Sequence, residues 1–138
     1  MSKTKAARLV AAVATGLLML LPAAAQTLRW ASQGDALTMD PHSQNEGLTN
    51  NLNGQIYETL VGRDRQLALV PALATSWTQT GPQTWRLTLR SGVRFHDGTP
   101  LTPADVVFSV QRAQQPTANI SVYANALGTP VALDAQTV

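Results

Sequence analysis

The amino-acid sequence predicts an α/β fold for the part of the chain that follows residue 25. Three observations support this class. Residues 84–90 alternate between apolar and polar side chains, which is typical of a half-buried strand. Apolar residues recur at every fourth position between residues 47 and 61, as they do along one side of a helix. A threonine and a proline at positions 102 and 103 indicate the start of another helix.

The first 25 residues have the features of a cleaved secretory signal peptide. Positive charges at Lys3, Lys5 and Arg8 precede an apolar run over residues 9–21, and small residues follow at Ala23–Ala25. A helix of this run would rise about 20 Å, which is too short to span a hydrocarbon core of about 30 Å. We therefore expect cleavage after Ala25 rather than an uncleaved membrane anchor. The mature chain then covers residues 26–138.

The charge balance changes when this leader is set aside. Removing its three basic residues from the ten in the chain leaves seven, all arginine, against eight acidic residues, a formal net charge of −1. Neither a basic run nor a nucleic-acid-binding motif is present, so we expect no nucleic-acid partner. Cysteine is absent from the chain. We therefore expect no disulfide, no thiolate zinc site and no lipid anchor at the cleavage site.

The first elements after the leader are a predicted strand and a predicted helix. Residues 27–32 alternate Leu28 and Trp30 with other side chains, which favours a strand. A helix is expected between residues 47 and 61. Several asparagines and Gly54 weaken its intrinsic propensity, so packing must stabilise it. Its apolar side carries Leu48, Leu52, Ile56 and Leu60.

A short helical turn and a β-hairpin are predicted next. Pro71 is expected to start a single helical turn over residues 71–74, because proline is favoured at the first helical position. The hairpin has strands at residues 76–80 and 84–90, joined by a turn at Gly81–Pro82. One face of its second strand carries Trp85, Leu87 and Leu89.

The last predicted helix begins after Thr102. This residue is expected to cap a helix with Pro103 at its first position, Asp105 near the positive end of its dipole and Arg112 at its end. Residues 129–138 are typical of a turn followed by an extended segment. That segment has no closing element, so we expect the chain to be an N-terminal fragment of a longer protein.

One continuous block of the sequence resembles a known protein family. Residues 85–109 run WRLTLRSGVRFHDGTPLTPADVVFS. This order is similar to the signature region of the family 5 solute-binding proteins, which are the periplasmic peptide, oligopeptide and nickel receptors of ABC importers. Further resemblance lies in residues 40–42, 57–61 and 69–77. Pro103 departs from the family pattern, which usually has alanine there, but the first position of a helix tolerates proline.

This resemblance implies a fold and a function. The fold is the two-lobed periplasmic-binding-protein-like fold of type II, with residues 26–138 as the N-terminal part of the first lobe. The function is the substrate-binding component of an ABC importer, which captures di- or oligopeptides and delivers them to a permease in the inner membrane. Such a protein is a periplasmic monomer without catalytic activity or cofactor. A receptor for nickel or another small solute is the alternative within the family, and an exported hydrolase is the alternative outside it.

The resemblance also implies four candidate ligand contacts. Glu46, Gly47 and Leu48 open the first predicted helix, in a region that lines the cleft of family members. Adding an extended peptide there as a short strand would use main-chain hydrogen bonds. The alternative, that these three residues only start the helix, explains them equally well. Tyr123 follows the second helix, in a region that also approaches the ligand in relatives.

The segment Phe95–Gly98 favours a structural interpretation. Asp97 and Gly98 are a strong turn pair, because glycine adopts positive φ without strain. Phe95 is expected to cover the end of the hairpin, while His96 and Asp97 bond to nearby backbone. A catalytic role for the last two lacks a nucleophile nearby.

A metal site is the other interpretation of the two histidines. Asp40 and His42 could bind a metal together with His96, since imidazole suits nickel and zinc. Histidines this far apart in a sequence more often serve turns and caps. We therefore expect no metal site.

The cleavage site is directly testable. Ala23 and Ala25 lie behind the apolar run in the positions that a signal peptidase requires. Mass spectrometry of the exported protein is expected to give an N-terminus at Gln26. Membrane-bound protein that still carries Met1 would contradict this prediction.

Overall fold

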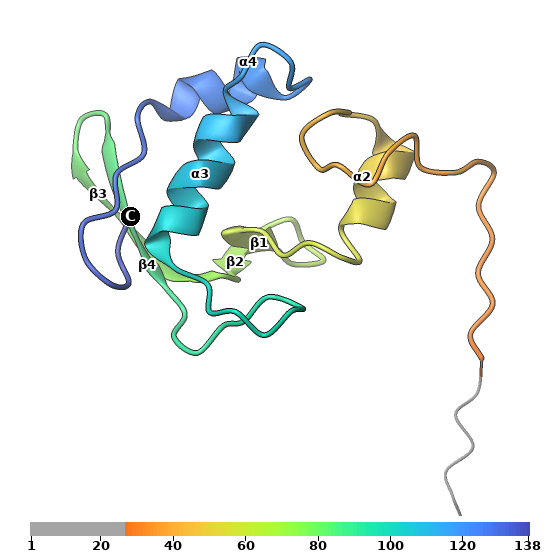
Figure 1. The fold of residues 1–138 in the computed structure, drawn as a ribbon, viewed down its shortest axis with the longest axis horizontal. Coiled ribbons are helices and arrows are strands. Elements are labelled where there is room, and N and C mark those ends of the chain that lie inside the picture. Colours follow the sequence, from red (N-terminus) through yellow and green to blue (C-terminus); the bar gives the residue numbers. More distant parts are fainter. Residues whose placement is uncertain (1–26) are drawn as a thin grey trace, which may run out of the picture. The chain divides into compact units, whose positions relative to one another are not determined.

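The computed structural model describes residues 27–138 (Figure 1). The proposed signal peptide lies outside the described residues. The chain divides into two units after Ser32, and of the first unit residues 27–32 are described. They form no strand, so the predicted first strand is wrong: Leu28 is 91% exposed and Trp30 is 65% exposed. Alternation of side chains cannot make a strand where no second backbone pairs with it.

Helix α2 (Gly47–Asn53) is shorter than the helix predicted for residues 47–61. It begins at the expected position but ends at Gly54, whose N–H still reaches Asn50 O at 2.9 Å. Ile56 lies beyond the helix and is 42% exposed. The prediction of one apolar helix side is therefore wrong for the positions that follow Leu52. The low helix propensity of the asparagines and the glycine is the physical reason, because packing does not compensate for it here.

Two short strands follow and pair with each other. Strand β1 (Val61–Arg63) is antiparallel to β2 (Leu69–Pro71), with Gly62 opposite Val70. The helical turn predicted for residues 71–74 is wrong. The N–H of Leu73 donates to Thr59 O at 3.1 Å and that of Ala74 to Leu60 O at 2.8 Å. These donors serve a neighbouring chain segment, and residues 72–73 form a bend instead of a helical turn.

The predicted hairpin is confirmed. Strand β3 (Ala74–Gly81) pairs antiparallel with β4 (Thr84–Leu89), with Trp77 opposite Leu87. Ala74 and Leu89 are buried at one end of the hairpin, whereas Trp85 at the other end is 55% exposed. The C-terminal segment lies along the free edge of β4: Leu87 N–H donates to Val138 O at 2.8 Å.

The second predicted helix is also confirmed. Helix α3 (Pro103–Ala113) has Thr102 at its N-cap, and it buries Val106 and Ala113 while Phe108 stays exposed. Helix α4 (Ser121–Ala124) and the 3₁₀-helix η1 (Asn125–Leu127) follow it and lie beside it (Figure 1). None of the helices in the described part of the chain has the length and apolar character that crossing a membrane requires.

The start of α3 is held by a reciprocal pair. The Asp105 carboxylate accepts hydrogen bonds from the N–H and the hydroxyl of Thr102, both at 2.7 Å. Together these residues form a capping box. The carboxylate also lies in the first turn of the helix, where the dipole favours negative charge.

Loss of the Thr102 cap is expected to destabilise the protein. Thr102→Ala should lower the free energy of unfolding by about 1 kcal/mol, within the range of roughly 0.5–2 kcal/mol for lost N-caps. Denaturant titration of the complete gene product measures this change. Thr102→Ser is the matched control, because it keeps the hydroxyl, and it should retain most of the stability. An unchanged midpoint for the alanine variant would mean that the cap contributes nothing.

Candidate functional site

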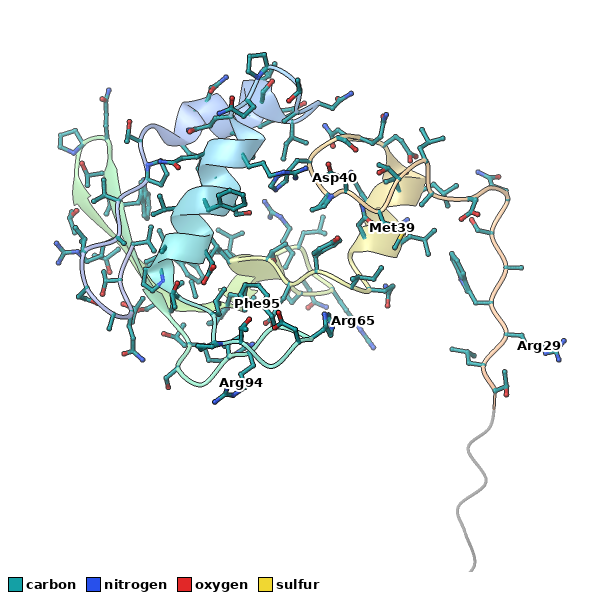
Figure 2. The ribbon with its side chains drawn as sticks, in the orientation of Figure 1. Arg29, Met39, Asp40, Arg65, Arg94 and Phe95 are labelled. Carbon is teal, nitrogen blue, oxygen red and sulfur yellow. The ribbon has the colours of Figure 1, made fainter. Side chains whose placement is uncertain are left out.

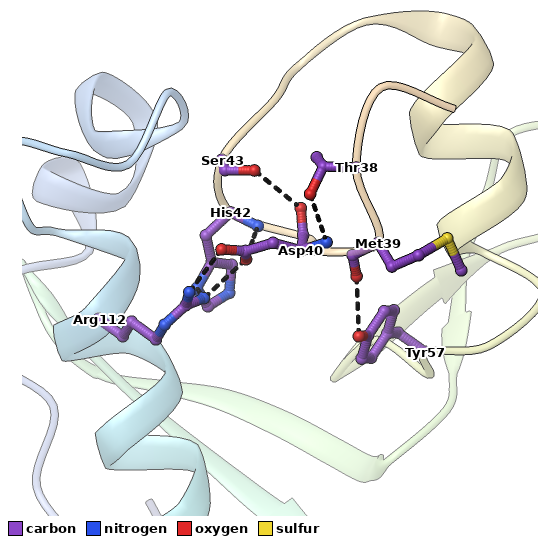
Figure 3. A network of polar contacts seen from close by, with 7 residues as sticks. All are labelled: Thr38, Met39, Asp40, His42, Ser43, Tyr57 and Arg112. Atoms are coloured by element: carbon purple, nitrogen blue, oxygen red, sulfur yellow. Dashed lines mark hydrogen bonds and ion pairs between the residues drawn. The ribbon is translucent and has the colours of Figure 1, made fainter. Parts of the chain in front are cut away.

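The Asp-Pro-His segment and helix α3 meet in a network of polar contacts that we call the clasp: Asp40, His42 and Arg112 (Figure 3). The guanidinium of Arg112 places Nη1 at 2.8 Å from Asp40 Oδ1 and Nη2 at 2.5 Å from Oδ2. This is the two-pronged geometry that fixes orientation as well as distance. The same Nη1 lies 2.9 Å from His42 Nδ1. The clasp therefore joins residues that are 72 positions apart in the sequence.

Local hydrogen bonds shape the loop that carries Asp40. Its Oδ1 accepts from His42 N–H at 3.0 Å, and its own N–H donates to the Thr38 hydroxyl at 3.0 Å. The Tyr57 hydroxyl donates to Met39 O at 2.9 Å (Figure 3). The sequence folds this way because a short carboxylate readily bonds the backbone two residues on. Asp40 therefore faces α3 from a fixed turn.

A further backbone contact ties the clasp to the segment before α4. Asn119 N–H donates to His42 O at 2.9 Å. His42 is thus held through its ring by α3 and through its carbonyl by the residues that lead into α4. The position of this imidazole depends on α3 and on the segment before α4.

The clasp sets the charge of its members. Hydrogen bonds from Arg112, with a smaller contribution from His42 N–H, hold the pKa of Asp40 well below its usual range. Burial, reinforced by the Arg112 charge, lowers the pKa of His42 from 6.5, although Asp40 acts in the opposite direction. A guanidinium has only donors, so His42 Nδ1 accepts and the ring proton lies on Nε2. The clasp contains a neutral imidazole, one carboxylate and one guanidinium.

A shallow pocket of about 300 Å³ lies next to the clasp. Its wall is mostly apolar and is built by α3, α4 and η1, with His42 as the contribution of the loop. Tyr123 is 68% exposed on this wall. The lining residues are His42, Ser109, Val110, Ala113, Ile120, Tyr123, Ala124 and Leu127.

The structure places the other three candidate contacts away from this pocket. The Glu46 carboxylate caps α2, accepting from Leu48 N–H at 2.9 Å and Thr49 N–H at 2.8 Å. Hydrogen bonds from the side chain and backbone of Thr49 lower the pKa of Glu46. Gly47 is exposed and Leu48 is half-buried. Neither these residues nor Glu46 line the pocket with Tyr123.

The Phe95–Gly98 segment forms a tight turn (Figure 2). Phe95 N–H donates to Thr99 O at 2.8 Å, and Gly98 has φ of 87°, a value that favours glycine. The Asp97 carboxylate accepts from the Thr99 N–H at 2.9 Å and from its hydroxyl at 2.7 Å, and these bonds lower the pKa of Asp97. His96 is exposed on this turn. The Asp97 carboxylate is thus used within the turn, whereas no backbone hydrogen bond of the His96 side chain is seen in the described part of the chain.

A second ion pair holds the segment before β1. Arg90 contacts both carboxylate oxygens of Glu58, at 2.9 and 2.8 Å, and donates to Ala72 O at 3.0 Å. It brings together three of the blocks that carry the family resemblance. Within residues 27–138 no three His, Cys, Asp or Glu side chains gather as a metal site would require.

Sequence reasoning missed the partner of Asp40. Arg112 was expected only as the end of a helix, and Asp40 only as a turn residue or metal ligand. No local pattern links the two, because their contact depends on how the loop meets α3. The one signal in the sequence for this contact was the Asp-Pro-His turn, because a turn of this kind leaves the Asp40 carboxylate able to accept further hydrogen bonds.

The clasp predicts how stability depends on pH. Because the folded-state pKa of Asp40 lies below 3.8, folding is favoured while the carboxylate is charged, and this contribution is lost as the pH falls below about 4. We expect Asp40→Asn to be less stable at neutral pH and to lose less stability on acidification. Unfolding free energies of the complete gene product between about pH 7 and about pH 3 measure this.

Asp35→Asn is the control for this measurement, because the Asp35 carboxylate accepts from the adjacent Ala36 N–H and lies outside the clasp. It should follow the wild-type profile. An Asp40→Asn profile parallel to that of the wild type would show that the carboxylate is not the acid-sensitive group.

The comparisons with known proteins agree on one family. Residues 68–138 match the model described as "Bacterial extracellular solute-binding proteins, family 5 Middle". The glutathione-binding protein GsiB of Escherichia coli (strain K12) is 30% identical over 112 residues, which are 80% of this chain and 22% of the relative. The chain thus spans about a fifth of the length of this curated relative.

Solved structures give the same result. The murein tripeptide binding protein MppA of Escherichia coli is 27% identical with a TM-score of 0.62, over 75% of this chain and 24% of that one. OppA of Haemophilus influenzae, in complex with the peptide RPPGFSPFR, is 26% identical with a TM-score of 0.66 over the same shares. The α/β elements described above thus have the arrangement found in these binding proteins. The chain belongs to the family 5 bacterial extracellular solute-binding proteins.

Proposed function

We propose that this chain is part of the extracytoplasmic substrate-binding component of an ABC importer that takes up peptides. Residues 1–25 act as the signal peptide, and residues 26–138 form the N-terminal portion of the binding domain. The protein works in the periplasm as a monomer, without enzymatic activity, and delivers peptides to permease subunits in the inner membrane. Ligand is held between two lobes that close around it.

The observation that carries this proposal is the likeness to two proteins whose names state peptide ligands. MppA is a murein tripeptide binding protein and OppA was solved with a bound peptide, and both align over 75% of this chain. GsiB, by its name, binds glutathione, which is itself a small peptide. Di- and oligopeptides are therefore the ligand class that the relatives support.

The candidate contacts divide into two groups under this proposal. At the start of α2, Glu46 has an extended backbone with φ of −131° and ψ of 154°, while its carboxylate is used by the cap. The Leu48 N–H is also used by the cap, and Glu46 O accepts from Asn50 N–H at 3.0 Å, so within residues 27–138 the N–H groups of Glu46 and Gly47 are the main-chain groups left to pair with an extended peptide. Tyr123 presents a phenol beside an apolar pocket, which suits a ligand side chain.

The geometry of the clasp argues against the exported-hydrolase alternative. Ser109 and His42 line one pocket, and Asp40 lies next to His42, so these three are the residues that a catalytic triad would use. In such a triad the histidine Nδ1 donates to the carboxylate. Here Nδ1 accepts from Arg112 instead, so Asp40 cannot orient the ring as a base for Ser109.

Peptide binding by the complete gene product tests the proposal. Isothermal titration calorimetry with di- to pentapeptides is expected to detect saturable binding. Tyr123→Ala should weaken it by about tenfold, or about 1.4 kcal/mol. Val122→Ala is the matched control, because Val122 is the neighbouring residue, is 78% exposed and does not line the pocket. Equal affinities for the two variants would remove Tyr123 from the site.

Metal analysis of the same protein tests the nickel alternative. Without a histidine tag, the purified protein is expected to hold less than one nickel or zinc ion per chain. One tightly bound ion per chain that disappears in His96→Ala would overturn the peptide proposal in favour of a metal receptor.

A further inference from the structure

We propose that Arg112 is a positioning residue of the pocket, which holds His42 as a neutral ring in the pocket wall and thereby makes ligand binding sensitive to pH. This inference rests on the proposed function, because it concerns the pocket beside Tyr123. Arg112 itself does not line that pocket, whereas His42 does. Any effect of Arg112 on a ligand must therefore pass through the imidazole.

The contact between Arg112 and His42 exists only when the ring is neutral. Nη1 lies 2.9 Å from Nδ1, and the guanidinium can only donate. A second proton on the ring would occupy Nδ1, so that two donors and two positive charges would face each other. Protonation of His42 is therefore incompatible with the clasp as it stands.

Among residues 27–138, the carboxylate that acts on His42 is already in use. Asp40 is the acidic group that acts on His42, and both of its oxygens are held by Arg112, with Oδ1 also accepting from His42 N–H. In the described part of the chain, the other ionisable side chains near the clasp and pocket are Tyr57, which acts on the Arg112 charge, and Tyr123 on α4. A protonated ring must either compete with Arg112 for Asp40 or leave the wall.

The direction of the pH effect follows from linkage. Burial and the Arg112 charge lower the pKa of His42 from 6.5, so the closed clasp binds fewer protons than a state in which the ring is free. Acidification below about pH 6.5 therefore shifts the population towards the open clasp. The pocket loses its loop wall in that state, because His42 is the residue through which the loop reaches it. Binding weakens as the fraction of competent pocket falls.

Nitrogen NMR of the histidine rings tests the positioning role without any ligand. In the complete gene product, labelled at histidine nitrogen, the His42 ring should be the Nε2–H form at neutral pH and should titrate with a midpoint below 6.5. His42→Asn assigns the signal of the His42 ring. An Nδ1–H ring, or a midpoint at 6.5 or above, would overturn the proposal even if peptides bind.

Arg112→Lys separates geometry from charge. Lysine keeps the positive charge but lacks the planar fork that meets both Asp40 oxygens and Nδ1 together. We expect the His42 midpoint to rise towards 6.5 in this variant. Arg94→Lys is the matched control, since Arg94 donates to Gly98 O in a different loop. An unchanged His42 midpoint in Arg112→Lys would show that the positive charge alone acts on the ring. It would overturn the positioning role of the guanidinium fork.

Calorimetry with trileucine tests the consequence for binding. The wild-type dissociation constant should increase roughly threefold or more between about pH 7.5 and about pH 5.5. His42→Asn should remove most of this dependence, because its amide oxygen accepts from Arg112 without titrating in this range. A dependence that persists in His42→Asn would overturn the pH inference. If trileucine does not bind at either pH, the proposed function is challenged, and the ring titration still decides the role of Arg112.

Discussion

The contact between Arg112 and Asp40 is the constraint on which the candidate site depends. It joins a turn that precedes α2 to the last turn of α3, across 72 positions of sequence. Both oxygens of the carboxylate and both terminal nitrogens of the guanidinium take part, so the pair fixes an orientation and not only a distance. His42 is placed by this pair, and the pocket wall that His42 supplies follows from it.

The Arg112–Asp40 pair contributes more to the geometry of the site than to the stability of the protein. The Arg112 and Asp40 side chains are 43% and 32% exposed, and ion pairs in contact with water add little to stability. The Glu58–Arg90 pair is similar, with both side chains nearly half exposed. Each pair nonetheless links two chain segments that do not share a helix and are not paired as strands. The buried apolar residues of the described part of the chain are mostly alanine, so such polar connections determine how the loops meet the helices.

The elements that were predicted correctly from the sequence are those that depend on local patterns. The β3–β4 hairpin and the start of α3 depend on alternation, on a turn pair and on a cap, all within a few residues. The wrong predictions concern segments whose structure depends on whether a distant part of the chain pairs with them, and not on the local pattern alone. Residues 27–32 alternate but pair with no strand among the described residues, and Pro71 opens no helix because Leu73 and Ala74 donate to residues 59 and 60. Arg112 was missed because its partner is distant in sequence.

The same contacts determine which main-chain and side-chain groups remain available to a ligand. The Glu46 carboxylate is used by the α2 cap, and the Asp40 carboxylate is used by Arg112, so neither acid near the start of α2 is free to select a charged ligand group. What remains exposed is extended backbone at Glu46 and a mostly apolar pocket edged by His42 and Tyr123. Backbone pairing accepts many sequences, and an apolar pocket discriminates mainly by size. The proposed role in peptide uptake fits this composition, and His42 is the group on which the proposed pH response depends.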